Sequence, residues 1–189
     1  LHGVGVSVTN ALSTRLEVQV KREGKLHRIV FAGGEVIEPL AIIDKCPIKE
    51  TGTAVRVWPD ARYFESAKYS ITELERLLRA KAVLLPGVIV RLNTEKNSGE
   101  FDSKQWHYPN GLTSYLQELF AEEEPIAPIF SAEKYITQAE EQFAMGEGAA
   151  WAFAWFESAG AGESYVNLIP TASGGTHEAG LRTGIFDAL

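Results

Sequence analysis

The sequence has very little cysteine and no excess of positive charge. A single cysteine, Cys46, among 189 residues excludes a disulfide within the chain and every metal site built from several cysteines. The four histidines stand at positions 2, 27, 107 and 177, with no i, i+4 pair of the kind that binds a metal from one helix face. The net charge of −7 argues against a domain that binds nucleic acid generally through a basic face. It leaves open a DNA-handling machine in which other parts make the contacts.

Long apolar runs are also missing. No stretch approaches the ~20 apolar residues that a membrane-spanning helix needs, and no basic region of a signal peptide stands at the N-terminus. With 45% hydrophobic and 23% charged residues, the composition is that of a globular protein large enough for one large domain or two modest ones. The single cysteine favours a reducing compartment, so we expect the cytoplasm and no membrane partner.

Alternating apolar and polar residues predict an antiparallel meander over residues 15–60. The alternation runs on both sides of the turn "REG" (22–24), "AGGE" (32–35) supplies a second turn, and "GTAVRVWPD" (52–60) predicts a further strand that Pro59 ends. A short helix over 6–12 is expected before the meander. The first third of the chain is therefore predicted to be mainly sheet.

The next third contains two predicted helices. Ser70 and Glu73 have the spacing of a capping box, and Pro86 with Gly87 ends the helix that follows them. A strand at 88–92 and a polar turn at 94–104 come next. Asn110 is predicted to cap the second helix, whose apolar residues follow helical spacing from 112 to 120.

The last third begins with "AEEEPIAPIF" (121–130), read as a connection. "AAWAFAWFE" (149–157) and "SYVNLIPT" (164–171) predict two strands, and the bulky stripe of the first favours a core over a ligand platform. A final helix, capped by Thr176, is expected. Four of its residues should face the core: Leu181, Ile185, Ala188 and Leu189. Ser173, Thr176 and His177 lack the G-x-S-x-G elbow of a hydrolase.

Two glycines stand at the start of the chain, in "LHGVGVSVTNAL" (1–12). A glycine-rich turn at a helix N-terminus directs several unpaired N–H groups at one point and suits phosphate. The pattern H-G-x-G lacks the third glycine of the dinucleotide fingerprint and the Lys-Ser/Thr of a Walker loop. An ordinary turn and a phosphate site therefore both remain open, and the initial Leu leads us to expect that part of such a site precedes the sequence.

Three stretches together resemble one family. "LHGVGVSVTNALS" (1–13) is similar to the glycine-box loop of the type II topoisomerase branch of the GHKL ATPases. "TGTAVRVWPD" (51–60) resembles the strand motif that follows it there, and "SYVNLIPTASGGTHEAGLRTG" (164–184) resembles the start of the transducer domain. Their order and spacing agree across essentially the whole chain, which is far more specific than any one glycine pair.

The resemblance implies an ATP site. The backbone N–H groups of the glycine box would hold the β- and γ-phosphates, and the ATP-binding residues would be Leu1, His2, Gly3, Val4, Gly5, Val6 and Thr53. Thr53 would lie at the adenine end. Arg22 would line the outer edge of the pocket, where aminocoumarin inhibitors bind such enzymes; a solvent-facing charge in a hairpin turn is the alternative for this residue.

The same resemblance implies that other parts of the site are missing from this sequence. The general-base Glu, the Mg²⁺-binding Asn and the adenine-binding Asp of the family would precede residue 1, and the Lys that reaches the γ-phosphate would follow residue 189. No catalytic and no metal-binding residue is therefore assigned, although ATP and Mg²⁺ are the expected cofactors. We expect this stretch alone to be inactive as an ATPase.

The fold expected from the resemblance is α/β, of the α+β kind. Residues 1–110 would be the later half of a GHKL ATPase sandwich, and residues 111–189 would be the first part of a ribosomal-S5-like transducer domain. The implied partners are DNA, a second copy of the same chain on ATP binding, and a DNA-cleaving subunit in an A2B2 assembly. A chaperone or mismatch-repair ATPase of the GHKL family and a non-catalytic binding module are the alternatives.

Overall fold

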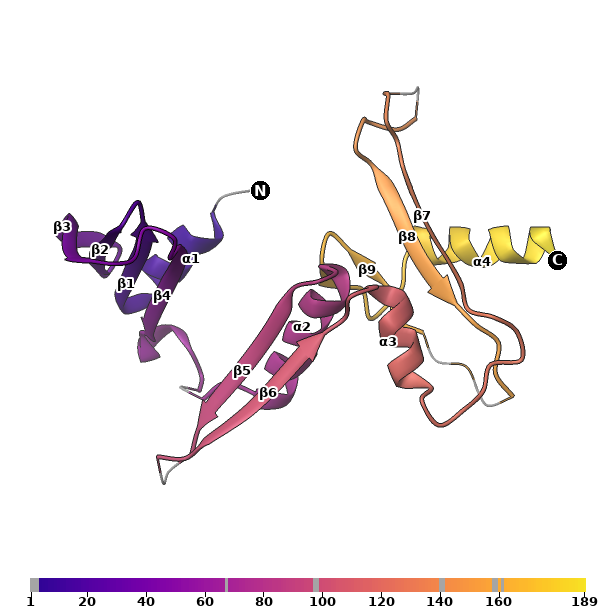
Figure 1. Ribbon diagram of the computed structural model, residues 1–189, viewed down its shortest axis with the longest axis horizontal. Coiled ribbons are helices and arrows are strands. Elements are labelled where there is room, and N and C mark those ends of the chain that lie inside the picture. The colour runs from indigo at the N-terminus through magenta and orange to yellow at the C-terminus, as the bar shows by residue number, and fades with distance from the viewer. Residues whose placement is uncertain (1–3, 67, 97–98, 140–141, 158–159, 161) are drawn as a thin grey trace. The chain divides into compact units, whose positions relative to one another are not determined.

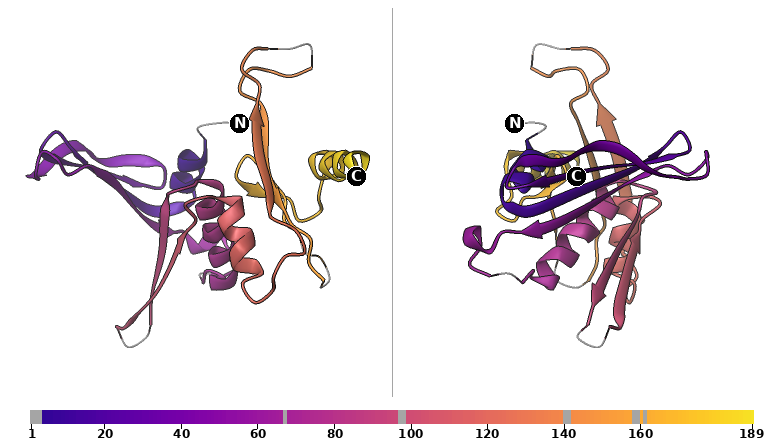
Figure 2. Two further views of the ribbon diagram at one scale, coloured as in Figure 1. Left: turned by 45° about the vertical axis from the view of Figure 1, so that its right-hand side comes forward. Right: turned by 90° about the vertical axis from the view of Figure 1, so that its left-hand side faces the viewer.

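The computed structural model describes residues 4–66, 68–96, 99–139, 142–157, 160 and 162–189. The chain divides into two compact units, Leu1–Tyr69 and Ser70–Leu189 (Figures 1 and 2). This division reflects where residues contact one another most densely, within each unit. The expected boundary between residues 110 and 111 rests on the family resemblance and stays a prediction.

The first unit is a four-stranded antiparallel sheet with a short helix. Helix α1 (Gly5–Ala11) precedes the strands β1 (Ser13–Arg22), β2 (Lys25–Ala32), β3 (Glu35–Lys45) and β4 (Gly52–Pro59), and the 3₁₀ turn η1 (Ala61–Tyr63) follows. The strand order is β3-β2-β1-β4. The predicted meander is confirmed over β1 to β3, and the fourth strand joins the sheet on the far side of β1.

Local sequence explains this sheet. The β1–β2 hairpin turns at Glu23 and Gly24, both with positive φ, so that Arg22 pairs with Lys25; a turn with two positive φ angles matches the twist of the flanking strands. Leu16 and Val30 are the most deeply buried residues of this unit, at 1% and 0% exposure. Leu16 lies opposite Phe31 and Val30 lies opposite Glu17, so the two are buried on opposite faces of the sheet.

The second unit combines three helices with three short antiparallel pairs. Its helices are α2 (Ile71–Leu84), α3 (Leu112–Leu119) and α4 (Thr176–Ala188). Its strand pairs are β5 (Ile89–Glu95) with β6 (Phe101–His107), β7 (Phe130–Tyr135) with β8 (Gly148–Phe153), and β9 (Tyr165–Val166) with β10 (Ile169–Pro170). The mixture of helix and strand agrees with the predicted α+β class.

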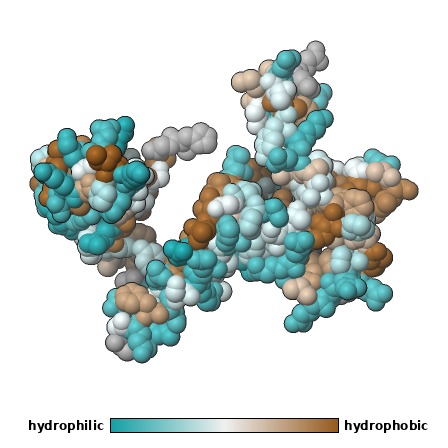
Figure 3. All heavy atoms as spheres, viewed as in Figure 1, coloured by the Kyte–Doolittle hydropathy of each residue, from teal (hydrophilic) through white to brown (hydrophobic). Residues whose placement is uncertain are grey.

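The core of this unit lies between α2, β5–β6 and α3. Ala82, Val83, Tyr108 and Tyr115 are buried there, and Val90, Trp106 and Leu112 pack against them. The rings of Tyr108 and Tyr115 meet edge to face at 5.5 Å. In the space-filling view, hydrophobic surface also remains visible on the second unit (Figure 3).

Helix α2 matches its prediction. The Ser70 hydroxyl accepts a hydrogen bond from the Glu73 N–H at 3.4 Å, and the helix ends at Leu84, before Pro86 and Gly87. The predictions for the other two caps are wrong. Gly111, with φ +54°, stands at the N-cap of α3 in place of Asn110, and Gly175 stands at the N-cap of α4 in place of Thr176.

Three further predictions are wrong. The predicted turn at 94–104 overlaps both strands of the β5–β6 hairpin, because cross-strand pairing overrides the polar composition of Phe101–His107. The predicted strand 164–171 is a tight hairpin that turns at Asn167 and Leu168, both with positive φ. Helix α4 has no buried residue: Leu181 and Leu189 are 36% and 86% exposed, Ala188 is exposed, and only Ile185 of the four residues is partly buried.

Candidate functional site

The start of α1 is the part of the predicted phosphate site that the structure describes. Val4 is the N-cap, Gly5 is the first helical residue, and no described side chain caps the helix. The Val8 N–H donates to the Val4 carbonyl at 2.9 Å, whereas the first-turn N–H groups have no helical partner by geometry. Leu1, His2 and Gly3 lie outside the described residues. Within the part of the chain that the structure describes, no side chain caps these N–H groups, and the phosphate site stays a prediction.

Gly5 adds space to these donors. A Cβ built on Gly5 would meet no described atom beyond its own helix backbone and chain neighbours within 4 Å, so the space on that side of Gly5 is open. Val6 lies one residue further along α1 and is 65% exposed. The described surroundings of residues 4–6 are thus open to solvent at Gly5 and Val6.

Thr53 and Arg22 lie at one end of the sheet. Thr53 pairs with Val20 across the β1–β4 ladder, and Arg22 ends β1 just beyond the Lys21–Gly52 pair. Arg22 is exposed and donates to Glu23 at 3.2 Å. Helix α1 instead joins the sheet at the opposite end of β1, where the Asp60 N–H donates to the Leu12 carbonyl. Thr53 and Arg22 thus lie near the C-terminal end of β1. Val4–Val6 belong to the helix that leads into the N-terminal end of β1.

A charged network lies on the same sheet. Glu17, 7% exposed, accepts hydrogen bonds from Gln19 at 2.8 Å and Arg15 at 3.2 Å. These bonds, the Gln19 bond first, hold the pKa of the Glu17 carboxyl below its usual value, against the opposing effect of burial. Arg28 pairs with Glu38 on the neighbouring strand at 2.5 Å. This network orders the polar face of β1 to β3.

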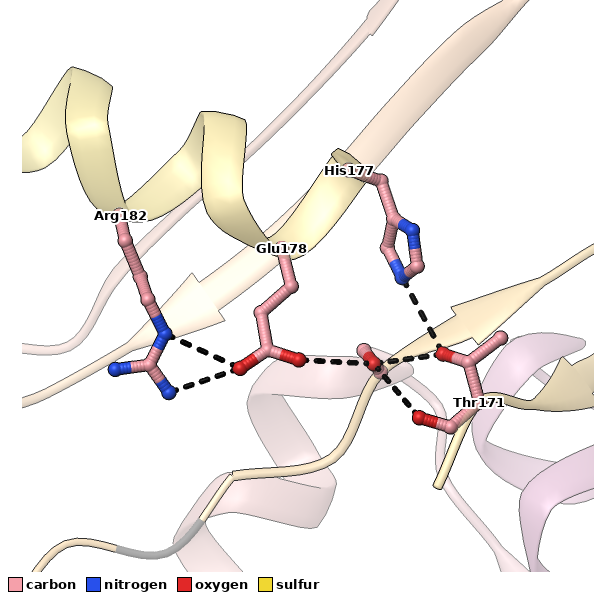
Figure 4. A network of polar contacts seen from close by, with 5 residues as sticks. Thr171, His177, Glu178 and Arg182 are labelled. Carbon is pink, nitrogen blue, oxygen red and sulfur yellow. Dashed lines mark hydrogen bonds and ion pairs between the residues drawn. The ribbon is translucent and has the colours of Figure 1, made fainter. Parts of the chain in front are cut away.

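The second unit contains a hollow of about 560 Å³ that the sequence did not indicate. Helix α2, the segments 162–165 and 170–175, and the first turns of α4 line it. Figure 4 shows the polar network at its α4 side. There Arg182 donates to Glu178 at 2.8 and 3.1 Å, and the Thr171 hydroxyl lies 3.3 Å from His177 Nε2.

Two tyrosines hold a carboxylate on another wall of this hollow. Tyr115 donates to Glu163 at 2.9 Å, and Tyr165 donates to the other oxygen of the same carboxylate. Burial first, and then the Glu163 bond, raises the pKa of Tyr115 to about 12. Both hydroxyls thus stay protonated donors near neutral pH. The residues come from parts of the chain far apart in sequence, so spacing alone could not predict the hollow.

The described residues contain no group of three or more His, Cys, Asp or Glu that could hold a metal ion. Among them, too, no helix has the length and apolar character required to cross a membrane.

Known proteins match the whole chain, and one protein family matches its later part. The family described as DNA gyrase B matches residues 111–189. The B subunit of DNA topoisomerase 4 from Pseudomonas aeruginosa is 46% identical over the full chain, and that from Escherichia coli is 41% identical. The chain spans 29% of the length of each of these relatives.

Solved structures show the same likeness. The 43K ATPase domain of Thermus thermophilus gyrase B, in complex with an aminocoumarin, matches with a TM-score of 0.76 and 31% identity, covering 96% of this chain and 47% of that one. The topoisomerase IV ATP-binding domain of Francisella tularensis, in complex with a small-molecule inhibitor, matches with a TM-score of 0.64 and 35% identity, covering 98% of this chain and 48% of that one.

The fold and these matches define the class of protein that the chain is similar to: the ATPase region of the B subunits of the bacterial type II topoisomerases. Within that class, its full length is similar to part of the DNA topoisomerase 4 B subunits, at 46% and 41% identity to the two relatives named above. The stretches "VWPD", "RAKAVLLPGV" and "SYVNLIPTASGGTH" also look closer to the B subunit of topoisomerase IV than to gyrase B, which is the close alternative.

Proposed function

We propose that this chain supplies one side of an ATP site in a type II topoisomerase of the topoisomerase IV kind, together with the region that follows it. The uncapped first turn of α1, with open space beside Gly5, is the observation that carries this proposal. Backbone amides at a helix start stabilise phosphate charge without a lysine. The family's glycine box uses the same chemistry.

Each named residue has one role in this proposal. The backbone N–H groups of Leu1, His2, Gly3, Val4, Gly5 and Val6 hold the β- and γ-phosphates. Thr53 lies at the adenine end and hydrogen-bonds toward the adenine-reading Asp that the resemblance places outside this sequence. Arg22 borders the pocket, at the edge where an aminocoumarin such as the one bound to the Thermus thermophilus neighbour would dock.

Proton transfer and metal binding are left to residues that this sequence does not contain. When bound, Mg²⁺ would neutralise phosphate charge, and its Asn ligand and the general-base Glu are expected upstream. The residues of this chain bind and orient the nucleotide. Positioning and electrostatic stabilisation are the main contributions that a protein makes to phosphoryl transfer.

The whole protein would use ATP binding to bring two of its copies together and to close a gate. The closed gate traps a DNA duplex, which passes through a break that the A subunit of topoisomerase IV makes in another duplex. The outcome would be decatenation and relaxation of DNA by an A2B2 assembly. We expect this assembly in the cytoplasm, associated with the nucleoid. The topoisomerase 4 B subunits that the chain is similar to come from bacteria.

A calorimetric titration tests the nucleotide site. The 189-residue chain and a version extended upstream to the start of the ATPase domain are each titrated with a non-hydrolysable ATP analogue and Mg²⁺. We expect binding by the longer version only, and no ATPase activity in the shorter one. Tight binding by the 189-residue chain would mean that the site is complete within it, and absence of binding by both would leave α1 as an ordinary turn and helix.

A further inference from the structure

We propose that the hollow between α2 and the start of α4 binds a phosphate group of an anionic ligand. The ATP site proposed above is built from residues of the first unit, whereas every residue of this hollow belongs to the second. It would therefore be a separate site, with arginine forks as its main donors.

Arg76 and Arg79 form the cationic wall. They stand three residues apart on α2, so both project from one side of the helix, and both line the hollow. Neither joins an ion pair within the described parts of the chain. The Arg79 guanidinium lies 5.3 Å from the ring centre of Tyr115. Stacking on an aromatic ring orients a guanidinium while its N–H donors, which lie in its own plane, stay free.

The carboxylates of the hollow are already engaged. Glu178 is paired with Arg182, and the bond from Arg182 is the largest cause of the lowered pKa of the Glu178 carboxyl. Glu163 accepts from the hydroxyls of Tyr115 and Tyr165. Arg182 thus balances the charge of Glu178, and the Glu163 carboxylate is held by two neutral hydroxyl donors. Within the described parts of the chain neither carboxylate forms an ion pair with Arg76 or Arg79, whose N–H donors remain for a ligand.

The opposite wall offers smaller polar groups. The Ser164 and Thr171 hydroxyls lie 2.7 Å apart, and Thr171 also contacts His177. The chain between them and α4 is the glycine-containing segment 171–175, in which Gly174 has φ +70° and a Cβ would stand 2.9 Å from the Glu178 carboxylate. Phosphate oxygens could thus meet guanidinium on one side and hydroxyl on the other.

The size fits a phosphate-bearing molecule. A hollow of about 560 Å³ lies within the range of small-molecule sites and exceeds the need of a single phosphate ion. Two planar guanidinium forks match the geometry of phosphate oxygens. The phosphate could belong to a free small molecule or to the backbone of a nucleic acid, and both present the same oxyanion.

The test uses the natural-length protein saturated with a non-hydrolysable ATP analogue and Mg²⁺, so that the nucleotide site is filled. Inorganic phosphate is the probe, and the broadening of its ³¹P signal reports binding. We expect a dissociation constant of about 1 mM or lower. In Arg76→Gln and Arg79→Gln the affinity should fall about tenfold, because each variant loses a charge-assisted hydrogen bond. Arg79→Lys should retain part of it, since the charge remains.

Arg91→Gln is the matched control. Arg91 lies on β5 in the same unit and donates to Gln105 outside the hollow, so its loss should leave phosphate affinity unchanged. Thermal melting checks that each variant folds. A 20-base-pair DNA duplex added as competitor identifies the source: displacement of phosphate indicates nucleic acid, and lack of displacement indicates a free phosphate compound. No binding by the parent protein, or equal affinities in the folded Arg76, Arg79 and Arg91 variants, would overturn the proposal.

Discussion

Leu168 shows how a single residue can be held in an unfavourable backbone conformation. It forms the second central position of the β9–β10 turn with φ +69°, after Asn167 with φ +47°. Asn suits such an angle, whereas Leu does not, because its Cβ crowds the following carbonyl. The Lys81 ammonium donates to the Leu168 carbonyl from α2. We interpret this bond as one contact that keeps the turn in place.

This strain predicts an unusual order of stability. Leu168→Gly and Leu168→Ala both lose the side chain, but only glycine adopts the positive φ freely. We expect the glycine variant to be more stable by about 1 kcal/mol, measured by urea unfolding. At Leu181, inside α4, the same pair should show the reverse order by about 1 kcal/mol. Equal stabilities of the two Leu168 variants would show that the turn is unstrained.

Glu17 predicts how the free energy of unfolding depends on pH. Its folded-state pKa lies below the usual value, so its stabilising contribution is present above the unfolded-state pKa of about 4.5 and is lost as the pH falls through the folded-state value. We expect Glu17→Gln to lose less stability than the parent between pH 5 and pH 3 in urea unfolding. Asp60 and Glu178, whose pKa values are also lowered, would keep some dependence. Parallel curves for the variant and the parent would contradict this role.

At the scale of elements, the start of helix α2 is fixed by its N-cap residue, Ser70. The Ser70 hydroxyl caps the helix at the Glu73 N–H. Ser70→Ala should cost about 1 kcal/mol of unfolding free energy, and Ser70→Asp should retain most of it, because the carboxylate caps the same N–H group. Urea unfolding followed by circular dichroism measures both. If the alanine and aspartate variants were equally stable, the cap would contribute nothing.

The elements that could be predicted are those with a strong local signal. The β1–β2 hairpin has period-two alternation around Gly24, and α2 has a cap at one end and Pro86 with Gly87 at the other. Strand β6 was missed because its sequence, "FDSKQWH", is polar and most of its residues are exposed. It is defined by its ladder with β5, which no local pattern encodes.

At the scale of the whole molecule, the family could be predicted and the hollow could not. The glycine box, the "TGTAVRVWPD" strand and the 164–184 stretch carry the resemblance in short motifs, so the sequence sufficed. The hollow combines Arg79, Glu163 and Glu178, which are brought together by tertiary packing of distant segments. The inward face expected for α4 also depended on tertiary packing. No residue of α4 is buried by the described parts of the chain.

The central claim is that the backbone at the start of α1 holds the phosphates of ATP. Gly5→Ala tests it in the natural-length protein, with Gly184→Ala in α4 as the matched control, since no described atom lies within 4 Å of a Cβ at either position. Alanine favours a helix over glycine, so neither variant should lose stability in thermal melting.

The decisive measurement is the affinity of both variants for a non-hydrolysable ATP analogue with Mg²⁺. The account predicts that Gly5→Ala binds about tenfold more weakly than the parent, because the added methyl group keeps the phosphates from charge-assisted hydrogen bonds with the backbone, while Gly184→Ala binds as the parent does. Unchanged affinity in a folded Gly5→Ala protein would contradict the claim that ATP is held there.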